Sequence, residues 1–163
     1  MGVTKGVADR VGQVERNAEL RTGSVLMALA GVGFVGYGIV FLAMNFAGSG
    51  FELGVASLDG AARADLDPTV AFYIGHLHVA TAAFIISTGI AVAALSWYGV
   101  RRRQRWAWAT ATVAAVVGLA IALPMHWVGG FEHDWVTHLG PIYLAAGAFV
   151  IGVVLSHRGM QTP

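Results

Sequence analysis

Five histidines lie near those ends of the apolar segments that are expected on the same side. Imidazole is the side chain of this sequence that is best suited to chemistry. The five histidines are His76, His78, His126, His133 and His138, whereas His157 lies at the opposite end. Imidazole binds haem iron, copper, zinc and non-haem iron, and it can take up a proton near neutral pH. The chain contains no cysteine. Thiolate catalysis, cysteine-based zinc sites and iron–sulfur clusters are therefore excluded.

Three of these histidines project onto helix faces that consist of small residues, because side chains three or four positions apart share a face. The faces are His76 with Ala80, Ala83, Ser87 and Ala91; His126 with Ala122, Gly118 and Ala115; and His138 with Pro141, Ala145, Ala148 and Gly152. Residues two apart on a helix point about 200° apart, so we expect His76 to face inward and His78 outward. Pro124 is expected to end or kink its helix just before His126.

These three small-residue faces are expected to meet inside the bundle. They predict a cofactor-binding or metal site formed by His76, His126 and His138, with Glu132, His133 and Asp134 of the adjacent loop as further metal ligands. The candidate occupants are haem b held between two histidines, or a Cu, Zn or Fe ion. The alternatives are a metal-free pocket that handles protons or binds a quinone, a sensor of external pH, and histidines that merely populate the membrane interface. No phosphate loop or G-x-S-x-G motif is present, and no other motif specifies a reaction.

Composition places these histidines in a membrane protein. Of the 163 residues, 56% are hydrophobic and only 12% are charged, about half the charged fraction of a soluble domain. Apolar segments long enough to cross a bilayer predict transmembrane helices over about 24–46, 69–98, 106–127 and 139–156. Small residues on each segment favour close helix packing. The expected fold is therefore an all-α, up-down four-helix bundle over residues 23–157.

Two further segments complete the predicted organisation. Residues 1–22 carry valines at helical spacing between charged residues, which predicts a short amphipathic helix on the inner leaflet, with a solvated tail as the alternative. Residues 158–163 form a cytoplasmic tail. Asp67 followed by Pro68 predicts the start of the second helix. The connection 47–67 is long for a compact protein and suggests a cap or a partner surface.

The charged residues predict the orientation. Nine basic and three acidic side chains fall on the side of both termini and of the Arg101–Arg105 loop, giving about +6. Six acids and Arg63 fall on the other side, giving about −5. The positive-inside rule then places both termini in the cytoplasm and the histidine end outside the plasma membrane.

The inner hairpin, Trp97-Tyr98-Gly99-Val100-Arg101-Arg102-Arg103-Gln104-Arg105-Trp106-Ala107-Trp108, resembles the Arg-Arg-Gly-Glu-Arg-Trp-Ala-Trp turn of small four-helix membrane proteins of bacteria and archaea that include DoxX-like relatives. In this chain, Arg103 and Gln104 stand where that turn has Gly and Glu. The resemblance covers about a dozen residues. It implies the four-helix fold and a cytoplasmic hairpin, and it implies no activity.

Two functions from different classes follow from the sequence. The first is a metal- or haem-binding, redox-associated membrane protein. The second is a non-catalytic accessory or scaffold subunit whose small-residue faces and long outer loop bind other membrane subunits or a second copy. The bilayer is the expected environment in both cases, and nucleic acid is not an expected partner.

Overall fold

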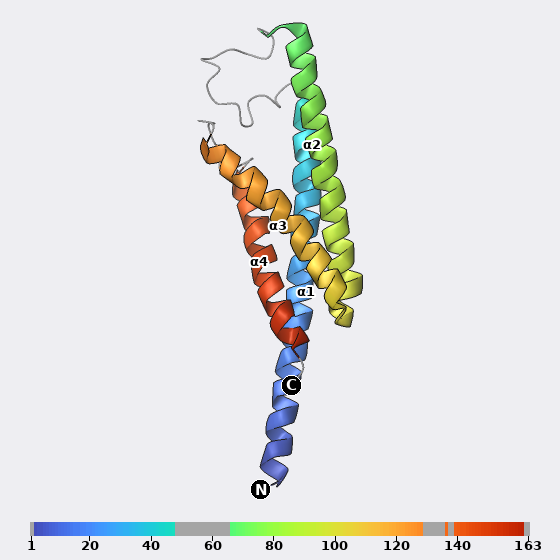
Figure 1. Cartoon of the computed structure of the whole chain (residues 1–163), viewed down its shortest axis with the longest axis vertical. Coiled ribbons are helices and arrows are strands. Elements are labelled where there is room, and N and C mark those ends of the chain that lie inside the picture. Colours follow the sequence, from blue (N-terminus) through green and yellow to red (C-terminus); the bar gives the residue numbers. More distant parts are fainter. Residues whose placement is uncertain (1, 48–65, 129–135, 137–138, 162–163) are drawn as a thin grey trace.

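The computed structural model describes residues 2–47, 66–128, 136 and 139–161. Within these ranges the chain is built from the helices α1 (Gly2–Phe46), α2 (Pro68–Ala94), α3 (Arg105–Val128) and α4 (Gly140–Met160). Helices α1 and α2 run side by side, and α3 crosses them obliquely (Figure 1). A π-helical turn, η2 (Leu95–Gly99), and a 3₁₀ turn, η3 (Val100–Arg102), continue α2 toward α3.

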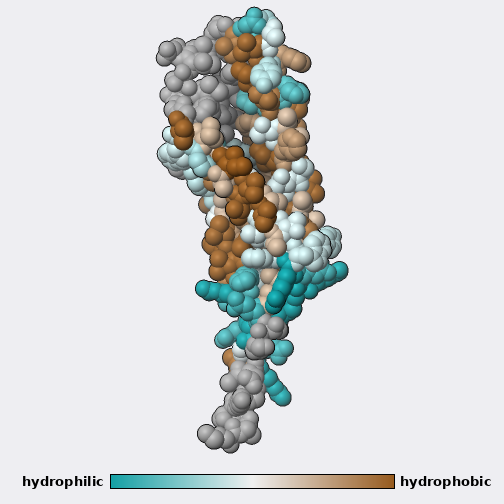
Figure 2. Space-filling view, viewed as in Figure 1, coloured by the Kyte–Doolittle hydropathy of each residue, from teal (hydrophilic) through white to brown (hydrophobic). Residues whose placement is uncertain are grey.

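The four long helices are apolar enough to cross a membrane, which confirms the all-helical prediction with four spans. The candidate spans are Arg10–Phe46, Pro68–Arg102, Arg105–Val128 and Gly140–Met160. Apolar side chains cover much of the visible outer surface of the bundle, and hydrophilic side chains gather at the end from which the N-terminal part of α1 projects (Figure 2). The chain is accordingly a multi-pass membrane protein.

The first helix is longer than predicted. A separate helix before the first span was expected, but α1 runs without interruption from Gly2 to Phe46. The stretch between the two predicted segments, residues 16–24, contains no proline and includes Glu, Leu, Ala and Arg, which are good helix formers. The helix therefore continues from the charged segment into the apolar one.

The start of the second helix agrees with the prediction. Asp67 caps α2, since its Oδ1 atom accepts a hydrogen bond from the Thr69 backbone N–H at 2.8 Å, and Pro68 occupies the first turn. Helix α2 and its continuation then extend over 35 residues to Arg102. At about 1.5 Å per residue this is about 52 Å, so the segment exceeds the thickness of a hydrocarbon core.

Helices α1 and α2 pack through small or polar residues spaced seven apart. The buried sets are Ser24, Gly31, Gly38 and Asn45 on α1, and Gly75, Ala82, Gly89 and Ser96 on α2 and η2. A Cβ atom on Gly31 would lie 2.6 Å from the Ala93 nitrogen and 2.8 Å from the Gly89 oxygen, and one on Gly38 would lie 3.1 Å from the Ala82 oxygen. The two backbones are therefore in direct contact, as membrane helices with small residues allow.

A second face of α1 packs equally closely against α4. A Cβ atom on Gly152 would lie 2.8 Å from both the Gly23 oxygen and the Met27 nitrogen. The Ser156 hydroxyl donates to the Gly152 carbonyl at 2.7 Å, which satisfies a buried polar group within its own helix. Farther along, the rings of Phe34 and Phe149 meet at a centroid distance of 6.4 Å. Helix α1 is therefore the shared partner of α2 and α4.

Helix α3 packs along only part of its length. Ala107, Ala111 and Ala115 are buried, and the Trp108 indole N–H donates to the Val153 carbonyl of α4 at 3.2 Å. Beyond Ala115 no residue of α3 is buried, although Leu119 still packs against the core and Trp127 bonds to α4. Helix α3 diverges from α1 and α2 from that point (Figure 1).

The hairpin between α2 and α3 is fastened by Arg103. This residue adopts a left-handed backbone conformation, with φ at 61°. Its guanidinium donates from Nη1 to the Gly159 carbonyl at 2.9 Å and from Nη2 to Asn17 Oδ1 at 2.6 Å. One side chain thus ties the hairpin to the end of α4 and to α1.

Candidate functional site

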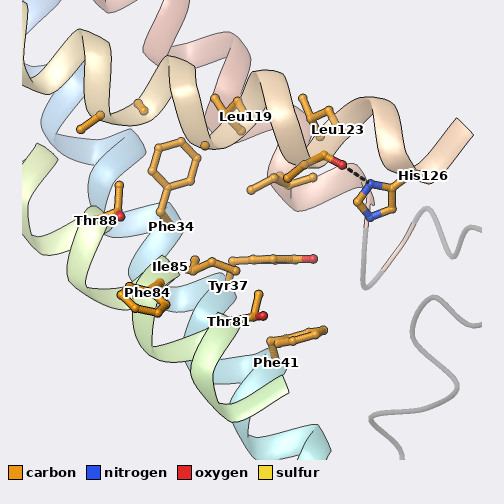
Figure 3. Close-up of a pocket in the computed structure, with 15 residues that line it drawn as sticks. Phe34, Tyr37, Phe41, Thr81, Phe84, Ile85, Thr88, Leu119, Leu123 and His126 are labelled. Carbon is orange, nitrogen blue, oxygen red and sulfur yellow. Dashed lines mark hydrogen bonds between the residues drawn. The ribbon is translucent and has the colours of Figure 1, made fainter. Parts of the chain in front are cut away.

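The divergence of α3 leaves an apolar groove between α3 and the pair α1 and α2. Its volume is about 460 Å³. Figure 3 shows side chains of α1 and α2 facing those of α3 across the groove. The lining residues are Phe34, Tyr37 and Phe41 of α1; Thr81, Phe84, Ile85 and Thr88 of α2; Ala114, Ala115, Gly118, Leu119, Ala122, Leu123 and His126 of α3; and Ile142 of α4.

Aromatic residues form the α1 wall of the groove. Phe34, Tyr37 and Phe41 recur at intervals of three and four, so they share one face of the helix. The rings of Tyr37 and Phe41 are nearly parallel, with a centroid distance of 6.3 Å and an interplanar angle of 16°. This wall offers flat apolar surfaces to an occupant with a ring of its own.

His126 stands at the end of the groove that is farther from the Arg101–Arg105 hairpin, in the last turn of α3 (Figure 3). Its Nδ1 atom lies 3.0 Å from the Ala122 carbonyl oxygen. A carbonyl oxygen can only accept, so Nδ1 is the donor, and in the neutral ring Nε2 carries the lone pair. Such a nitrogen can accept a hydrogen bond or ligate a metal, and ligating histidines commonly donate their other N–H to a carbonyl or carboxylate.

The end of α3 that carries His126 is held in place despite Pro124. The sequence predicted that the helix ends or kinks just before His126. The helix does not end there, since α3 continues through Pro124 to Val128. The Trp127 indole N–H donates to the Tyr143 hydroxyl of α4 at 3.2 Å. This bond connects the C-terminal end of α3 to the first turn of α4 and fixes the turn that carries His126.

Few polar groups accompany His126. Thr81, Thr88 and Tyr37 contribute hydroxyl groups, and no Lys, Arg, Asp or Glu is found among the described residues that line the groove. Ligand sites are commonly apolar, with a small number of polar groups that orient the ligand. The arrangement suits an apolar molecule with one polar end.

The prediction that His76 faces inward is wrong for the described chain. His76 is exposed, and His78 instead packs edge-on against Phe41 of α1, with ring centroids 5.1 Å apart and an interplanar angle of 69°. The face predicted for α2, with Ala83, Ser87 and Ala91, is exposed as well. The true packing face begins one residue earlier and follows the seven-residue spacing of Gly75 and Ala82.

The remaining predicted ligands are not brought together in the described residues. His138, His133, Glu132 and Asp134 lie outside the described ranges. Within those ranges, no three His, Asp or Glu side chains are grouped to hold a metal ion. His157 lies at the other end of the molecule, where its ring is 5.1 Å from that of Trp108.

Comparison with known proteins adds no relative. No protein family, curated protein or solved structure matches this chain. The groove and its residues are therefore the basis for a functional proposal.

The aromatic wall of the groove was missed in the sequence. Its signal is the helical spacing of Phe34, Tyr37 and Phe41 within an apolar span. The groove itself has no such signal, because it arises where α3 leaves its neighbours.

Proposed function

We propose that this chain is a redox-associated membrane protein that binds a membrane quinol in the groove between α1, α2 and α3. The observation that carries the proposal is the position of His126, with Nδ1 donating to Ala122, at the outer end of an apolar groove with an aromatic wall. A quinol has a flat ring, an apolar tail and hydroxyl groups. Its ring would lie against Tyr37 and Phe41, and a hydroxyl would donate to Nε2 of His126.

The proposal includes the topology predicted from the charges. The four helices cross the plasma membrane in up-down order, with both termini and the Arg101–Arg105 hairpin in the cytoplasm. The groove then opens within the bilayer near its outer face, where a membrane-dissolved molecule can enter sideways. The N-terminal charged segment then lies on the cytoplasmic side.

Quinol binding to the purified full chain tests the proposal. The probe is the reduced, quinol form of a short-chain ubiquinone analogue, added under anaerobic conditions to the protein in nanodiscs, and the readout is quenching of tryptophan fluorescence, to which Trp127 beside His126 contributes. We expect saturable quenching, and about tenfold weaker binding for His126→Ala, the equivalent of about 1.4 kcal/mol for one hydrogen bond. The matched control is His76→Ala, which removes an exposed histidine of α2 and leaves affinity unchanged. Absence of saturation, or equal effects of the two substitutions, would contradict the proposal.

A second candidate occupant is haem b, which the same histidine geometry favours. His126 would supply Nε2 to the iron, with its Nδ1–H bond to Ala122 fixing the ring as in other metal-ligating histidines. The absorbance spectrum of protein purified from haem-supplied cells separates the two candidates. A Soret band that His126→Ala removes and His76→Ala retains would favour haem over quinol.

The accessory-subunit alternative finds its support on α2. Ala83, Ser87 and Ala91 form a face of small residues that is exposed in this chain, and such faces allow close approach of another membrane helix. Substitution of Ala83 by Leu would then abolish co-purification of a partner subunit in mild detergent. Helix α1 offers less to a partner, because two of its faces already pack against α2 and α4.

A further inference from the structure

The N-terminal part of α1 stands clear of the other described helices (Figure 1). Contact with α4 reaches as far as Arg16, whose carbonyl oxygen lies near Gly159, and the Arg103 side chain reaches Asn17. Before Arg16 the helix continues to Gly2. An isolated helix as short as the segment from Gly2 to Arg16 is only marginally stable in water. A surface that pairs with this segment would therefore stabilise it.

The projecting segment carries an apolar stripe in heptad spacing. Val11, Val14 and Ala18 follow one another at intervals of three and four, as the a, d and a positions of a coiled coil do. Val11 is 52% exposed and Val14 is 68% exposed, and Ala18 is exposed too. The stripe continues into a surface hollow of α1 that Ala18, Arg21 and Val25 help to line. The other described helices therefore leave this side of α1 uncovered.

The charged residues beside the stripe indicate which partner fits this surface. With Val11 at an a position, Arg10 is the preceding g residue and Glu15 is the following e residue, and both are exposed. In a parallel two-stranded coiled coil, a g residue meets the e residue of the next heptad on the other chain. Arg10 of one copy therefore meets Glu15 of a second copy, and the symmetric pair forms again on the other side.

We infer that the N-terminal segment of α1 pairs with that of a second copy of this chain as a short parallel coiled coil outside the membrane. Two copies inserted in one bilayer share the same orientation, which makes the parallel arrangement the natural one. Confinement to the membrane also raises their effective concentration, so a short contact suffices. The pairing ends before Arg21, because this position would bring two like charges together. The inference does not depend on what the groove binds.

Cysteine cross-linking in membranes tests the inference, and the absence of native cysteine from the chain makes it clean. Residues at d positions face each other closely enough for a disulfide, which requires Cα atoms about 4.4–6.8 Å apart. Mild oxidation should convert most of the Val14→Cys variant to a disulfide dimer. The matched control is Gln13→Cys, an exposed neighbour at a c position, which should give at least fivefold less dimer.

Charge reversal adds a second readout in the Val14→Cys background. Arg10→Glu alone and Glu15→Arg alone should each lower the dimer yield severalfold, and the double reversal should restore it. Monomer extracted with unchanged elution in size-exclusion chromatography shows that the variants fold. Equal cross-linking at residues 13 and 14, no cross-linking at either, or indifference to the reversals would overturn the inference; a helix lying on the lipid surface or bound to a different protein gives one of these results.

Discussion

At the scale of single residues, Arg103 is unusual because it combines an unfavourable backbone conformation with two hydrogen bonds. A non-glycine residue in the left-handed region costs about 1–3 kcal/mol. Glycine at this position would carry no such cost. In this chain the guanidinium bonds to Gly159 and Asn17 offset it.

Substitution of Arg103 should separate these two effects. Arg103→Ala loses both hydrogen bonds and keeps the strained backbone, whereas Arg103→Gly loses the bonds and relieves the strain. We expect both variants to be less stable than the native chain, with the alanine variant about 1 kcal/mol less stable than the glycine variant. Denaturant unfolding in detergent micelles measures the difference. Equal stability of the two variants would show that the backbone at residue 103 is not strained.

Asp67 should respond to acid. Its pKa is lowered because the carboxylate accepts hydrogen bonds from the Thr69 backbone N–H and side chain. Because folding lowers the pKa of Asp67, the stability that the cap contributes is fully present above the pKa of an unfolded aspartate. It is lost as the pH falls through the lower pKa of the folded state. The amide proton resonance of Thr69 should therefore shift with a midpoint below that of a free aspartate. Asp67→Asn also caps the helix and should abolish this titration.

At the scale of helices, the glycines of α1 differ in what surrounds them. Gly31 faces the backbone of α2, whereas a Cβ atom on Gly36 would meet nothing within 4 Å. Gly31→Ala should force α1 and α2 apart and destabilise the protein by about 1–3 kcal/mol. Gly36→Ala should be neutral or slightly stabilising, because alanine is the better helix former. Thermal unfolding in one detergent compares the two, and a similar loss in both would mean that α1 and α2 do not touch at Gly31.

How far the sequence predicted these helices depends on the kind of signal. Asp67 and Pro68 specify a helix start through local chemistry, and this prediction is confirmed. The α2 packing face was misplaced by one residue, because Ala, Gly and Ser occur on several faces of that helix. The spacing of seven in Ser24, Gly31, Gly38 and Asn45 would have indicated the right face of α1.

The candidate site was less predictable than the helices. The position of His126 on the same face of its helix as Ala115, Gly118 and Ala122 could be predicted, and all four residues line the groove. That His78 rather than His76 packs against α1 could not be predicted. It follows from the rotation of α2 about its axis, which is set by the packing of Gly75 and Ala82. The groove depends on the separation of α3 from α1 and α2, a distance between helices that no local pattern encodes.

At the scale of the whole molecule, the charge asymmetry predicts which end faces the cytoplasm. Arg101, Arg102, Arg105 and Arg158 are all exposed at one end of the bundle. A cysteine introduced at Gln104 should react with an impermeant maleimide only after the cells are permeabilised. A cysteine at Val128, exposed at the opposite end of α3, should react in intact cells. The reverse pattern would invert the proposed topology and place His126 on the cytoplasmic side.

Helix α1 has a mechanical consequence that follows from its continuity. It spans 45 residues, or about 67 Å at 1.5 Å per residue, and it carries the heptad stripe at one end and the aromatic wall of the groove farther along. Because the helix is not interrupted, a tilt or rotation imposed at Val14 is expected to move Tyr37 and Phe41 as well. Under the proposed topology, pairing of two copies on the cytoplasmic side and occupancy of the groove near the outer leaflet would therefore be coupled through this one helix.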